Sequence, residues 1–256
     1  MINSFQKFRF IFLLRFVIIF SVIKSYNIPA INTEVFSMYK TLDILSPEHS
    51  QAGGWLAGFE YPWEALCRIK SFILELCKSI DKSEYNEISE NVFVHKTAVV
   101  APTAHIGAPC IIGANTEVRH CAFIRESALI GNNCVVGNSV EIKNAILFDS
   151  VQVPHFNYVG DSILGYKSHM GAGAVTSNVK SDQTVVVVKN GEEKFETGLK
   201  KFGAILGDNV EVGCNSVLNP GTVIGNNSNI YPLSCVRGTV PANSIYKTGG
   251  IIVDKQ

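Results

Sequence analysis

Three residues near the middle of the sequence have side chains that suit an acyl-transfer reaction. His155 offers an imidazole, a side chain that in its neutral form can take a proton from an amine that attacks an acyl group. Arg125 and Lys143 are eighteen residues apart, and each directly follows an apolar residue. If the two cations stack on one face, they form a seat for a phosphate. The plainer alternatives are a structural histidine and two solvated cations that bend apart, because stacked like charges repel.

A six-residue repeat must position these side chains. Stepping by six from Val94 to Phe148 meets only apolar anchors, and the period returns from Leu206 to Val236. Such a period fits a short strand and a corner, where Gly or Asn makes the sharp turn. Three units close one coil, and stacked coils lie about 4.8 Å apart. The sequence therefore predicts an all-β fold, a parallel β-helix, because a β-sandwich would need all these anchors to align by chance.

The anchors of the two runs are Val94, Val100, Ile106, Ile112, Val118, Ile124, Ile130, Val136, Ile142, Phe148, Leu206, Val212, Leu218, Ile224, Ile230 and Val236. The period fails twice. Between Phe148 and Leu164 the phase slips by two residues, and a lysine-rich insertion separates Ser177 from Ala204. Asn178 and Lys201 flank this insertion, whose loop we place at residues 179–200. Because loops on a rigid scaffold often carry function, we expect the candidate site near both faults.

The sequence divides into three segments, of which two precede the repeat and the third contains it. Residues 1–37 are an apolar extension, interpreted either as a signal anchor or as an upstream, non-native start with the working protein beginning near Met38. Residues 38–90 form a helical cap or connector, in which Tyr61 to Ile80 carries an apolar stripe at helical spacing. We expect this helix to cover the open end of the β-helix, as solenoid ends require. Residues 91–256 form the β-helix domain.

The composition excludes some functions. The formal net charge is zero, so nothing favours nucleic acid as a partner. The seven cysteines form no CxxC pair, and we interpret them as small buried hydrophobes of a reduced, cytoplasmic protein, although the apolar N-terminal segment leaves membrane anchoring open. We expect no metal, because no histidine pair has the H-x4-H spacing of the γ-class carbonic anhydrases that share this scaffold. The histidines considered are His95, His105, His120, His155 and His169.

Several motifs resemble a known family. Residues 141–143 read Glu-Ile-Lys, and residues 155–161 read His-x-x-Tyr-x-Gly-Asp. With Gly-Ala-Gly at 171–173 and Lys-Phe at 201–202, they resemble the acetyltransferase domain of bifunctional bacterial N-acetylglucosamine-1-phosphate uridyltransferase/glucosamine-1-phosphate acetyltransferase. The likeness covers roughly residues 94 to 245. It implies left-handed coils and a homotrimer with each active site between neighbouring β-helices.

The resemblance also implies a role for each candidate residue. His155 is the catalytic base, and Arg125 and Lys143 hold the sugar phosphate. Acetyl-CoA, the co-substrate, lies along the outer face, with the backbone of Ala172 near the acetyl group and His169 in the same cofactor-binding region. His169 stands where the family has Asn, which leaves the sugar open. The remaining substrate-binding residues are Tyr158, Asn178 and Lys201.

These roles predict an enzyme. It would move acetyl from acetyl-CoA to the amine of a hexosamine 1-phosphate, glucosamine 1-phosphate first among them, in UDP-N-acetylglucosamine and cell-envelope sugar biosynthesis. Only some ninety residues precede the repeat, so we expect a stand-alone acetyltransferase without the uridyltransferase half. The alternative is a non-catalytic trimeric scaffold, or a regulatory partner of a separate sugar-phosphate nucleotidyltransferase.

Overall fold

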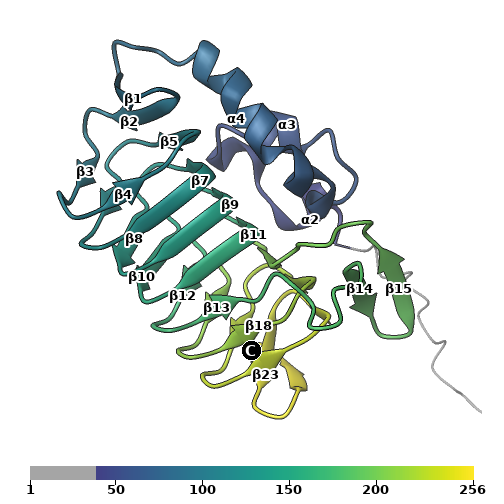
Figure 1. The fold of residues 1–256 in the computed structure, drawn as a ribbon. Helices are drawn as coiled ribbons and strands as arrows, with labels where there is room; N and C mark the ends of the chain where they lie inside the picture. Colours follow the sequence, from purple (N-terminus) through teal and green to yellow (C-terminus); the bar gives the residue numbers. More distant parts are fainter. Residues whose placement is uncertain (1–38) are drawn as a thin grey trace, which may run out of the picture. The chain divides into compact units, whose positions relative to one another are not determined.

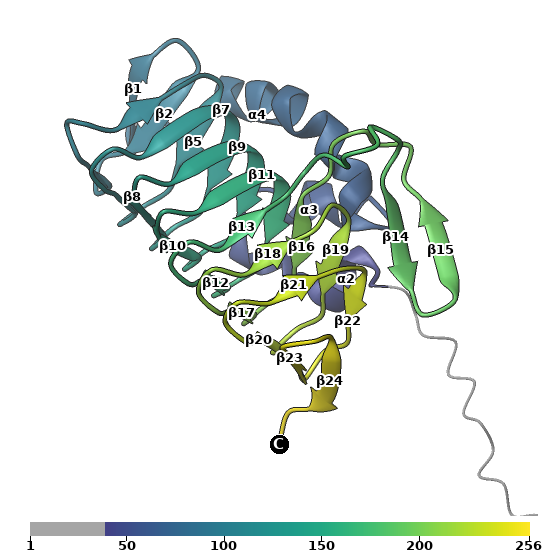
Figure 2. The same cartoon turned by 60° about the horizontal axis from the view of Figure 1, so that its bottom comes forward.

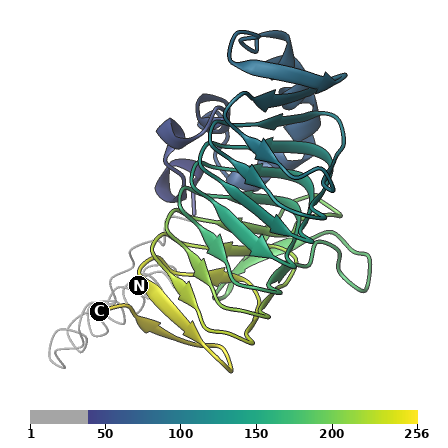
Figure 3. The same ribbon diagram turned by 90° about the vertical axis from the view of Figure 1, so that its left-hand side faces the viewer.

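The chain winds through three faces in every coil, and parallel strands stack on each face (Figure 1). The computed structural model describes residues 39–256, so the predicted extension at residues 1–37 lies outside the described part. Figure 3 views the stack of coils from the side. All strand pairs within the three faces are parallel, which confirms the predicted parallel β-helix.

The strands divide among the faces as follows. The first face holds β4 (His105–Ile106), β13 (Val175–Thr176), β18 (Val217–Leu218) and β21 (Cys235–Val236), and the second holds β2 (Val92–His95), β5 (Cys110–Ile112), β16 (Ala204–Leu206), β19 (Thr222–Ile224) and β22 (Thr239–Val240). β7 (Phe123–Ile130), β9 (Glu141–Leu147) and β11 (Tyr158–Leu164) run across both. The third face holds β3 (Val99–Val100), β6 (Glu117–Val118), β8 (Val135–Asn138), β10 (Gln152–His155), β12 (His169–Met170), β17 (Glu211–Val212), β20 (Asn229–Ile230) and β23 (Ser244–Lys247).

The apolar anchors fill the space between the faces. Of the sixteen anchors, all but Val100 and Ile106 are buried. These two belong to the first coil, which has a neighbouring coil on one side only. At this end β1 (Tyr85–Ser89) pairs antiparallel with β2, and at the other end β24 (Ile251–Asp254) pairs antiparallel with β23. The core is therefore a column of aliphatic side chains stacked coil upon coil.

The corners depend on one residue with a left-handed backbone, usually Asn or Ser. Asn115, Cys121, Ser127, Asn133 and Ser139 follow one another at intervals of six, with φ between 53° and 57°. Asn adopts this conformation more readily than most residues because its short polar side chain bonds locally. The prediction that Asn turns the corner is therefore confirmed.

The glycines that follow the anchors have a different purpose from the one expected. Gly137 is not among the residues with positive φ. A Cβ placed on it would lie 1.6 Å from the carbonyl oxygen of Pro154 in the next coil, and one on Gly107 would lie 1.7 Å from that of Arg125. These glycines are required because adjacent coils approach too closely for a side chain.

The two-residue slip predicted after Phe148 is two separate losses of one residue. Ile124 pairs with Ile142, eighteen residues later, but Ile130 pairs with Leu147, only seventeen later. One residue is thus missing between Ile142 and Leu147. The next coil, from Val159 to Leu164, is shortened in the same place. Phe148 is buried, but it is not the anchor in register, so that assignment was wrong.

The long insertion leaves the same corner as the two shortenings. Thr176 ends the first-face strand β13, and Ala204 begins the second-face strand β16. The intervening residues include a hairpin of β14 (Val187–Asn190) and β15 (Glu193–Glu196). All three irregularities therefore stack in one column, between the first and second faces.

The N-terminal helices cover a side of the β-helix rather than its open end. These are α2 (Thr41–Ile44), η1 (Pro47–His49), α3 (Gly53–Leu56), η2 (Pro62–Arg68) and α4 (Ile69–Lys78). α4 contacts β5, β7 and β9, and η2 contacts β11 (Figures 1 and 2). The predicted helix is present but begins as a 3-10 turn, and its expected position over the end was wrong. Its apolar stripe finds a larger surface along the coils.

A buried carboxylate fixes the segment between α2 and η1. Asp208 is 5% exposed and lies in the corner between the second and third faces. Its Oδ2 accepts hydrogen bonds from the backbone N–H of Ser46 at 3.1 Å and from the Ser46 hydroxyl at 2.5 Å. Its Oδ1 accepts one from the N–H of Tyr166 at 2.8 Å, and the Tyr166 ring stacks on His49 at 3.6 Å.

In residues 39–256 no helix has the length and apolar character needed to span a membrane.

The cysteines divide into two groups. Cys77, Cys110 and Cys134 are buried, and burial raises the pKa of the Cys134 thiol to about 12. The expectation of small buried hydrophobes is therefore confirmed for these three. It was wrong for the exposed thiols, which are Cys67, Cys121, Cys214 and Cys235.

This division predicts the reactivity of the thiols. Under native, reducing-agent-free conditions, a chromogenic disulfide reagent should titrate four thiols, and denaturant should release three more. The buried thiols are protected because neither the reagent nor the reactive thiolate form is accessible. Titration of all seven without denaturant would contradict the burial of Cys110 and Cys134.

Candidate active site

His155 is held at a corner by its backbone while its side chain is exposed. It ends β10, between the third and first faces. Its N–H donates to Asn157 Oδ1 at 3.1 Å, and its carbonyl accepts from the Gly173 N–H at 3.0 Å. The Asn157 amide is buried and donates to the carbonyls of Gly171 and Ala174 in the next coil. The corner therefore presents an exposed imidazole on a rigid backbone.

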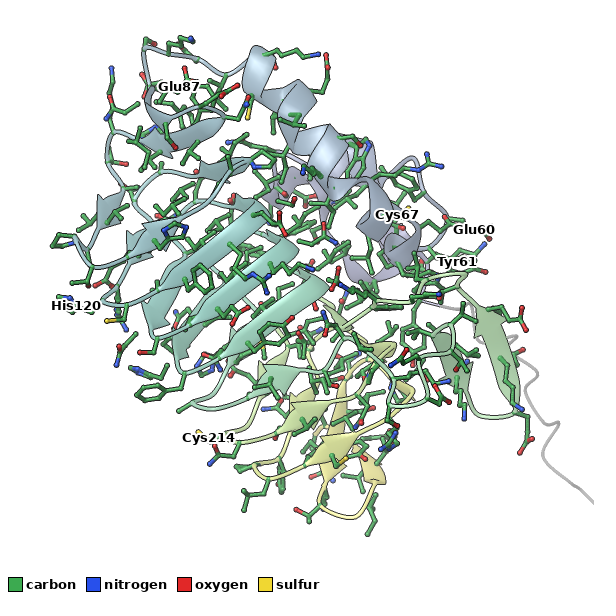
Figure 4. The ribbon with its side chains drawn as sticks, in the orientation of Figure 1. Glu60, Tyr61, Cys67, Glu87, His120 and Cys214 are labelled. Carbon is green, nitrogen blue, oxygen red and sulfur yellow. The ribbon has the colours of Figure 1, made fainter. Side chains whose placement is uncertain are left out.

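Ala172 lies beside His155 in the next coil. Gln152 is in register with His169, and three residues further along these parallel strands the same register brings His155 opposite Ala172. The Ala172 carbonyl accepts from the Asn215 N–H at 2.9 Å. Within residues 39–256, the Ala172 N–H donates to no protein acceptor. His120 and Cys214 mark the same edge of the molecule in Figure 4.

His169 lies on the third face, inside a separate polar pocket. Its Nδ1 is 2.7 Å from Glu211 Oε2. The pocket has a volume of about 400 Å³. It is lined by Ser150, Gln152, Lys167, His169, Asn209 and Glu211. His155 and Ala172 do not line this pocket. His169 is therefore near the predicted acetyl position along the strand, but it belongs to a separate pocket.

Tyr158 and Asn178 meet on the opposite side of the His155 corner, on the first face. The Tyr158 phenol oxygen accepts a hydrogen bond from Asn178 Nδ2 at 3.1 Å. The same amide donates to Asp161 Oδ2 at 2.5 Å, and Asp161 Oδ1 accepts from Asn144 Nδ2 at 2.9 Å. Asp161 is 5% exposed and has a φ of 48°. This buried carboxylate thus fixes the orientation of Asn178.

The surroundings of Tyr158 keep its hydroxyl protonated. Burial raises the pKa of the Tyr158 phenol, and the negative charges of Asp161 and Glu141 raise it further. The hydrogen bond from Asn178 and the charge of Arg125 act in the opposite direction but are smaller. At neutral pH the hydroxyl is therefore a donor available to an acceptor atom of a ligand.

The motif His-x-x-Tyr-x-Gly-Asp has a steric explanation. The Tyr158 ring lies across Gly160, where a Cβ would be 2.4 Å from the phenol oxygen. Asp161 follows at the shortened corner and binds Asn178 from there. Glycine at position 160 therefore allows Tyr158 to reach Asn178, because any larger residue would push the ring away.

Arg125 and Lys143 do not stack, which corrects the prediction from their spacing. The register shifts between Ile124 and Glu126, so Glu126 lies opposite Lys143. Arg125 is the extra residue at this bulge, and its Nη1 is 3.0 Å from Glu141 Oε1. In the described part of the chain, the Lys143 ammonium has no carboxylate within ion-pair distance. Of the two residues predicted to bind the phosphate together, only Lys143 therefore keeps a positive charge that no described carboxylate neutralises.

Lys201 lies at the corner that holds Asn178. It is exposed, and the N–H of the following residue, Phe202, donates to the Asn178 carbonyl at 3.0 Å. Lys143 is opposite Gly160 on the adjacent strand. The structure thus gathers Lys143, Tyr158, Asn178 and Lys201 around one part of the first face, with His155 at the edge of that face.

Sequence reasoning missed three residues of this region. Asp161 and Asn144 hold Asn178 in place, and Glu141 neutralises Arg125. Asp161 was visible as the last residue of the quoted motif. Among residues 39–256, no three His, Cys, Asp or Glu side chains lie close enough together to hold a metal ion.

Comparison with known proteins gives the same resemblance as the motifs. The protein of Methanococcus maripaludis strain C7 named Bifunctional protein GlmU is 32% identical over 209 residues, which are 80% of this chain and 51% of that protein. The Methanococcus aeolicus protein of the same name is 38% identical over 112 residues, 43% of this chain and 27% of that protein. The resemblance to GlmU is confirmed. This chain spans about half the length of the relatives that it matches most fully.

Two further similarities are narrower. Residues 122–228 match the family described as the GMPPB C-terminal domain. The PglB acetyltransferase domain of Neisseria gonorrhoeae, solved with acetyl coenzyme A, covers 64% of this chain and 57% of its own at 16% identity. Its TM-score of 0.31 is too low to support an argument. The GlmU likeness therefore rests on sequence.

The contact between Gly160 and Tyr158 predicts a strongly non-additive pair of substitutions. Gly160→Ala should lower the free energy of unfolding by about 1–3 kcal/mol, the usual cost of an extra group in a packed site. Combined with Tyr158→Ala, which removes the ring, the same alanine should cost much less. Urea denaturation of the two single variants and the double variant measures this coupling.

Gly54→Ala is the matched control. Gly54 lies in α3, and a Cβ there would meet nothing within 4 Å. This substitution should leave stability unchanged or raise it by up to about 1 kcal/mol, because Ala favours a helix. Additive effects of Gly160→Ala and Tyr158→Ala would contradict the steric explanation of the motif.

Proposed function

We propose that this protein is an acetyltransferase that moves acetyl from acetyl-CoA to the amine of an amino-sugar phosphate, with glucosamine 1-phosphate as the first candidate. The observation that carries the proposal is the corner where His155, whose side chain is exposed, lies opposite Ala172, whose N–H donates to no acceptor within residues 39–256. A base and an oxyanion donor at neighbouring positions are what amine acylation requires. The names of the relatives, one of which includes "nucleotidylyltransferase/acetyltransferase", support the same reaction.

The proposed chemistry needs one proton carrier. The amine nitrogen attacks the thioester carbonyl, the C–N bond forms, and His155 takes the proton that the nitrogen loses. The Ala172 N–H stabilises the negative oxygen of the tetrahedral intermediate. The C–S bond then breaks, and the proton passes from His155 to the CoA thiolate. The fixed backbone of His155 keeps the imidazole near the reacting nitrogen throughout.

The acceptor sugar is proposed to bind across the first face. Tyr158 and Asn178 offer a hydroxyl and an amide to the sugar, and Lys143 and Lys201 offer charge to its phosphate. Arg125 contributes less because Glu141 neutralises it. Acetyl-CoA is proposed to reach Ala172 from the third face, where Lys167 and His169 line the polar pocket. The expected homotrimer is part of this proposal, whereas a separate nucleotidyltransferase partner belongs to the scaffold alternative.

His155→Ala tests the base. It should lower kcat by about 10²- to 10⁴-fold, the usual contribution of a general base. His120→Ala is the matched control, because His120 is exposed in the same column of corners and the Ser139 N–H bonds to its carbonyl. The assay measures CoA release from acetyl-CoA and glucosamine 1-phosphate, with light scattering to show that both variants keep the wild-type oligomer, expected to be a trimer. Equal turnover of the His155 variant and wild type would contradict the mechanism.

A wild-type protein without turnover would favour the scaffold alternative. In that case no amino-sugar phosphate of a panel releases CoA, and the protein forms a stable complex with a nucleotidyltransferase instead. Turnover with any member of the panel excludes a purely structural role and identifies the sugar.

Lys143→Ala tests the phosphate seat. It should raise KM for the sugar phosphate by roughly 10- to 150-fold, since a hydrogen bond to a charged group contributes about 1.5–3 kcal/mol. It should change KM for glucosamine without phosphate far less. Arg125→Ala should have a smaller effect than Lys143→Ala, because the ion pair to Glu141 already neutralises it. Equal effects of Lys143→Ala on both sugars would show that Lys143 does not meet the phosphate.

A further inference from the structure

The residue that directly follows His155 has a backbone conformation that is unusual for its type. Phe156 has a φ of 52°, and 59% of it is exposed. This left-handed region suits Gly and Asn, whereas a bulky residue is strained there because its Cβ crowds the following carbonyl oxygen. The same position holds Ser139 in the preceding coil and Gly173 in the next. Phe156 is thus strained, apolar and exposed at the corner that presents the proposed base.

Residues with positive φ elsewhere in the β-helix also join the coils, which Phe156 does not. At the corner between the second and third faces, Asn209 Nδ2 donates to Asn227 Oδ1 at 3.2 Å. Asn227 Nδ2 donates in turn to Asn243 Oδ1 at 3.2 Å. The Phe156 ring can form no such bond, and more than half of its surface lies in water. An Asn at position 156 would therefore make a more stable corner, and strain of this kind is typical of functional sites.

The neighbours of Phe156 along this corner are small, apart from one amide. Ser139 is short, and Gly173 has no side chain. A Cβ on Gly173 would lie 2.2 Å from Asn215 Oδ1, so the Asn215 amide reaches this position from one coil further on. His120 and Cys214, which Figure 4 labels, mark the same edge of the molecule. The exposed ring therefore has a polar amide near it and small side chains on either side.

The proposed reaction brings a carbon skeleton to this corner. The acceptor amine must come within hydrogen-bond distance of the His155 imidazole, so the atoms that carry the amine lie close to the next residue as well. In an amino sugar these atoms form a pyranose ring. Its C–H groups make an apolar face, and its hydroxyls lie at the rim. An aromatic ring can cover the apolar face, and amides can bind the hydroxyls.

We infer that Phe156 is a substrate-binding residue whose ring covers the C–H face of the acceptor sugar while the sugar's amine faces His155. The inference rests on the proposed function, which places the amine. It names the acceptor as a pyranose rather than an open-chain amine or an amino acid, because neither of these offers an apolar face of that size. The strain at position 156 then has a purpose, since the residues that turn a corner easily have no ring.

Phe156→Asn separates binding from stability. Because Asn tolerates a positive φ, this variant should keep the wild-type Tm or raise it by up to about 4 °C. Its KM for glucosamine 1-phosphate should rise by about 5- to 30-fold, since the sugar loses an apolar surface, while its KM for acetyl-CoA should stay within about twofold. A residue with a purely structural role would not weaken one substrate in a protein that is equally or more stable.

Two further variants control for the ring and for the strain. Phe156→Tyr keeps the ring and should hold KM for glucosamine 1-phosphate within about threefold of wild type. Leu233→Asn is the matched control, because Leu233 has a φ of 61°, is 71% exposed and occupies the same corner position. It lies three coils further on, about 14 Å from Phe156. Leu233→Asn should relieve the same strain and leave KM for the sugar phosphate unchanged.

Calorimetry with glucosamine 1-phosphate and the full-length protein, without acetyl-CoA, measures the same loss without turnover. Phe156→Asn should weaken this binding by about 5- to 30-fold. If the wild type binds the sugar phosphate but releases no CoA, the proposed function fails and the binding comparison still decides the inference. Wild-type affinity in Phe156→Asn overturns it, as does a KM change confined to acetyl-CoA or absence of binding by the wild type. Loss of the wild-type mass in light scattering would assign the ring to a subunit contact and also overturn it.

Discussion

The distance between adjacent coils is the constraint on which the rest of the structure depends. Parallel ladders fix this distance, and it leaves no room for a side chain where the corners cross, as at Gly137 and Gly107. After the first coil, it also gives most corners the same backbone turn, supplied by a residue with positive φ. The proposed reaction depends on the same ladder, because the ladder holds His155 and Ala172 opposite each other.

The irregular lengths are confined to the corner between the first and second faces. This separates the packing of the helices from the proposed chemistry. Two coils lose one residue there, the last coil loses two, and another gains the insertion, while the corner of His155 keeps its regular form. The shortened corner receives the helices, since Asn144 Nδ2 donates to the Leu66 carbonyl at 3.1 Å. The N-terminal segment and the insertion can therefore meet, as the rings of Tyr61 and Phe195 do, without disturbing the corner where the proposed chemistry occurs.

The six-residue period was enough to predict the coils, because every anchor must be apolar for the same reason: it fills the space between the faces. It could not predict the register of Arg125 and Lys143, since a single extra residue at a bulge changes which side chains are neighbours. The contacts of the helices were equally hidden. Asp208 and Ser46 are 162 residues apart, and no local pattern indicates such a pairing. The motif resemblance named both Tyr158 and Asn178, and the structure joins them by a hydrogen bond, with Asp161 of the same motif holding the Asn178 amide.

The bond between Ser46 and Asp208 has a consequence for the order of folding. Residues 41–50 leave the ribosome early, but the carboxylate that receives them and the Tyr166 ring that stacks on His49 are synthesised much later. Coils can add to one another as they emerge, because each contacts only its neighbours. The segment around Ser46 can therefore dock fully only after the coil of Asp208 has closed, although it precedes Asp208 by 162 residues.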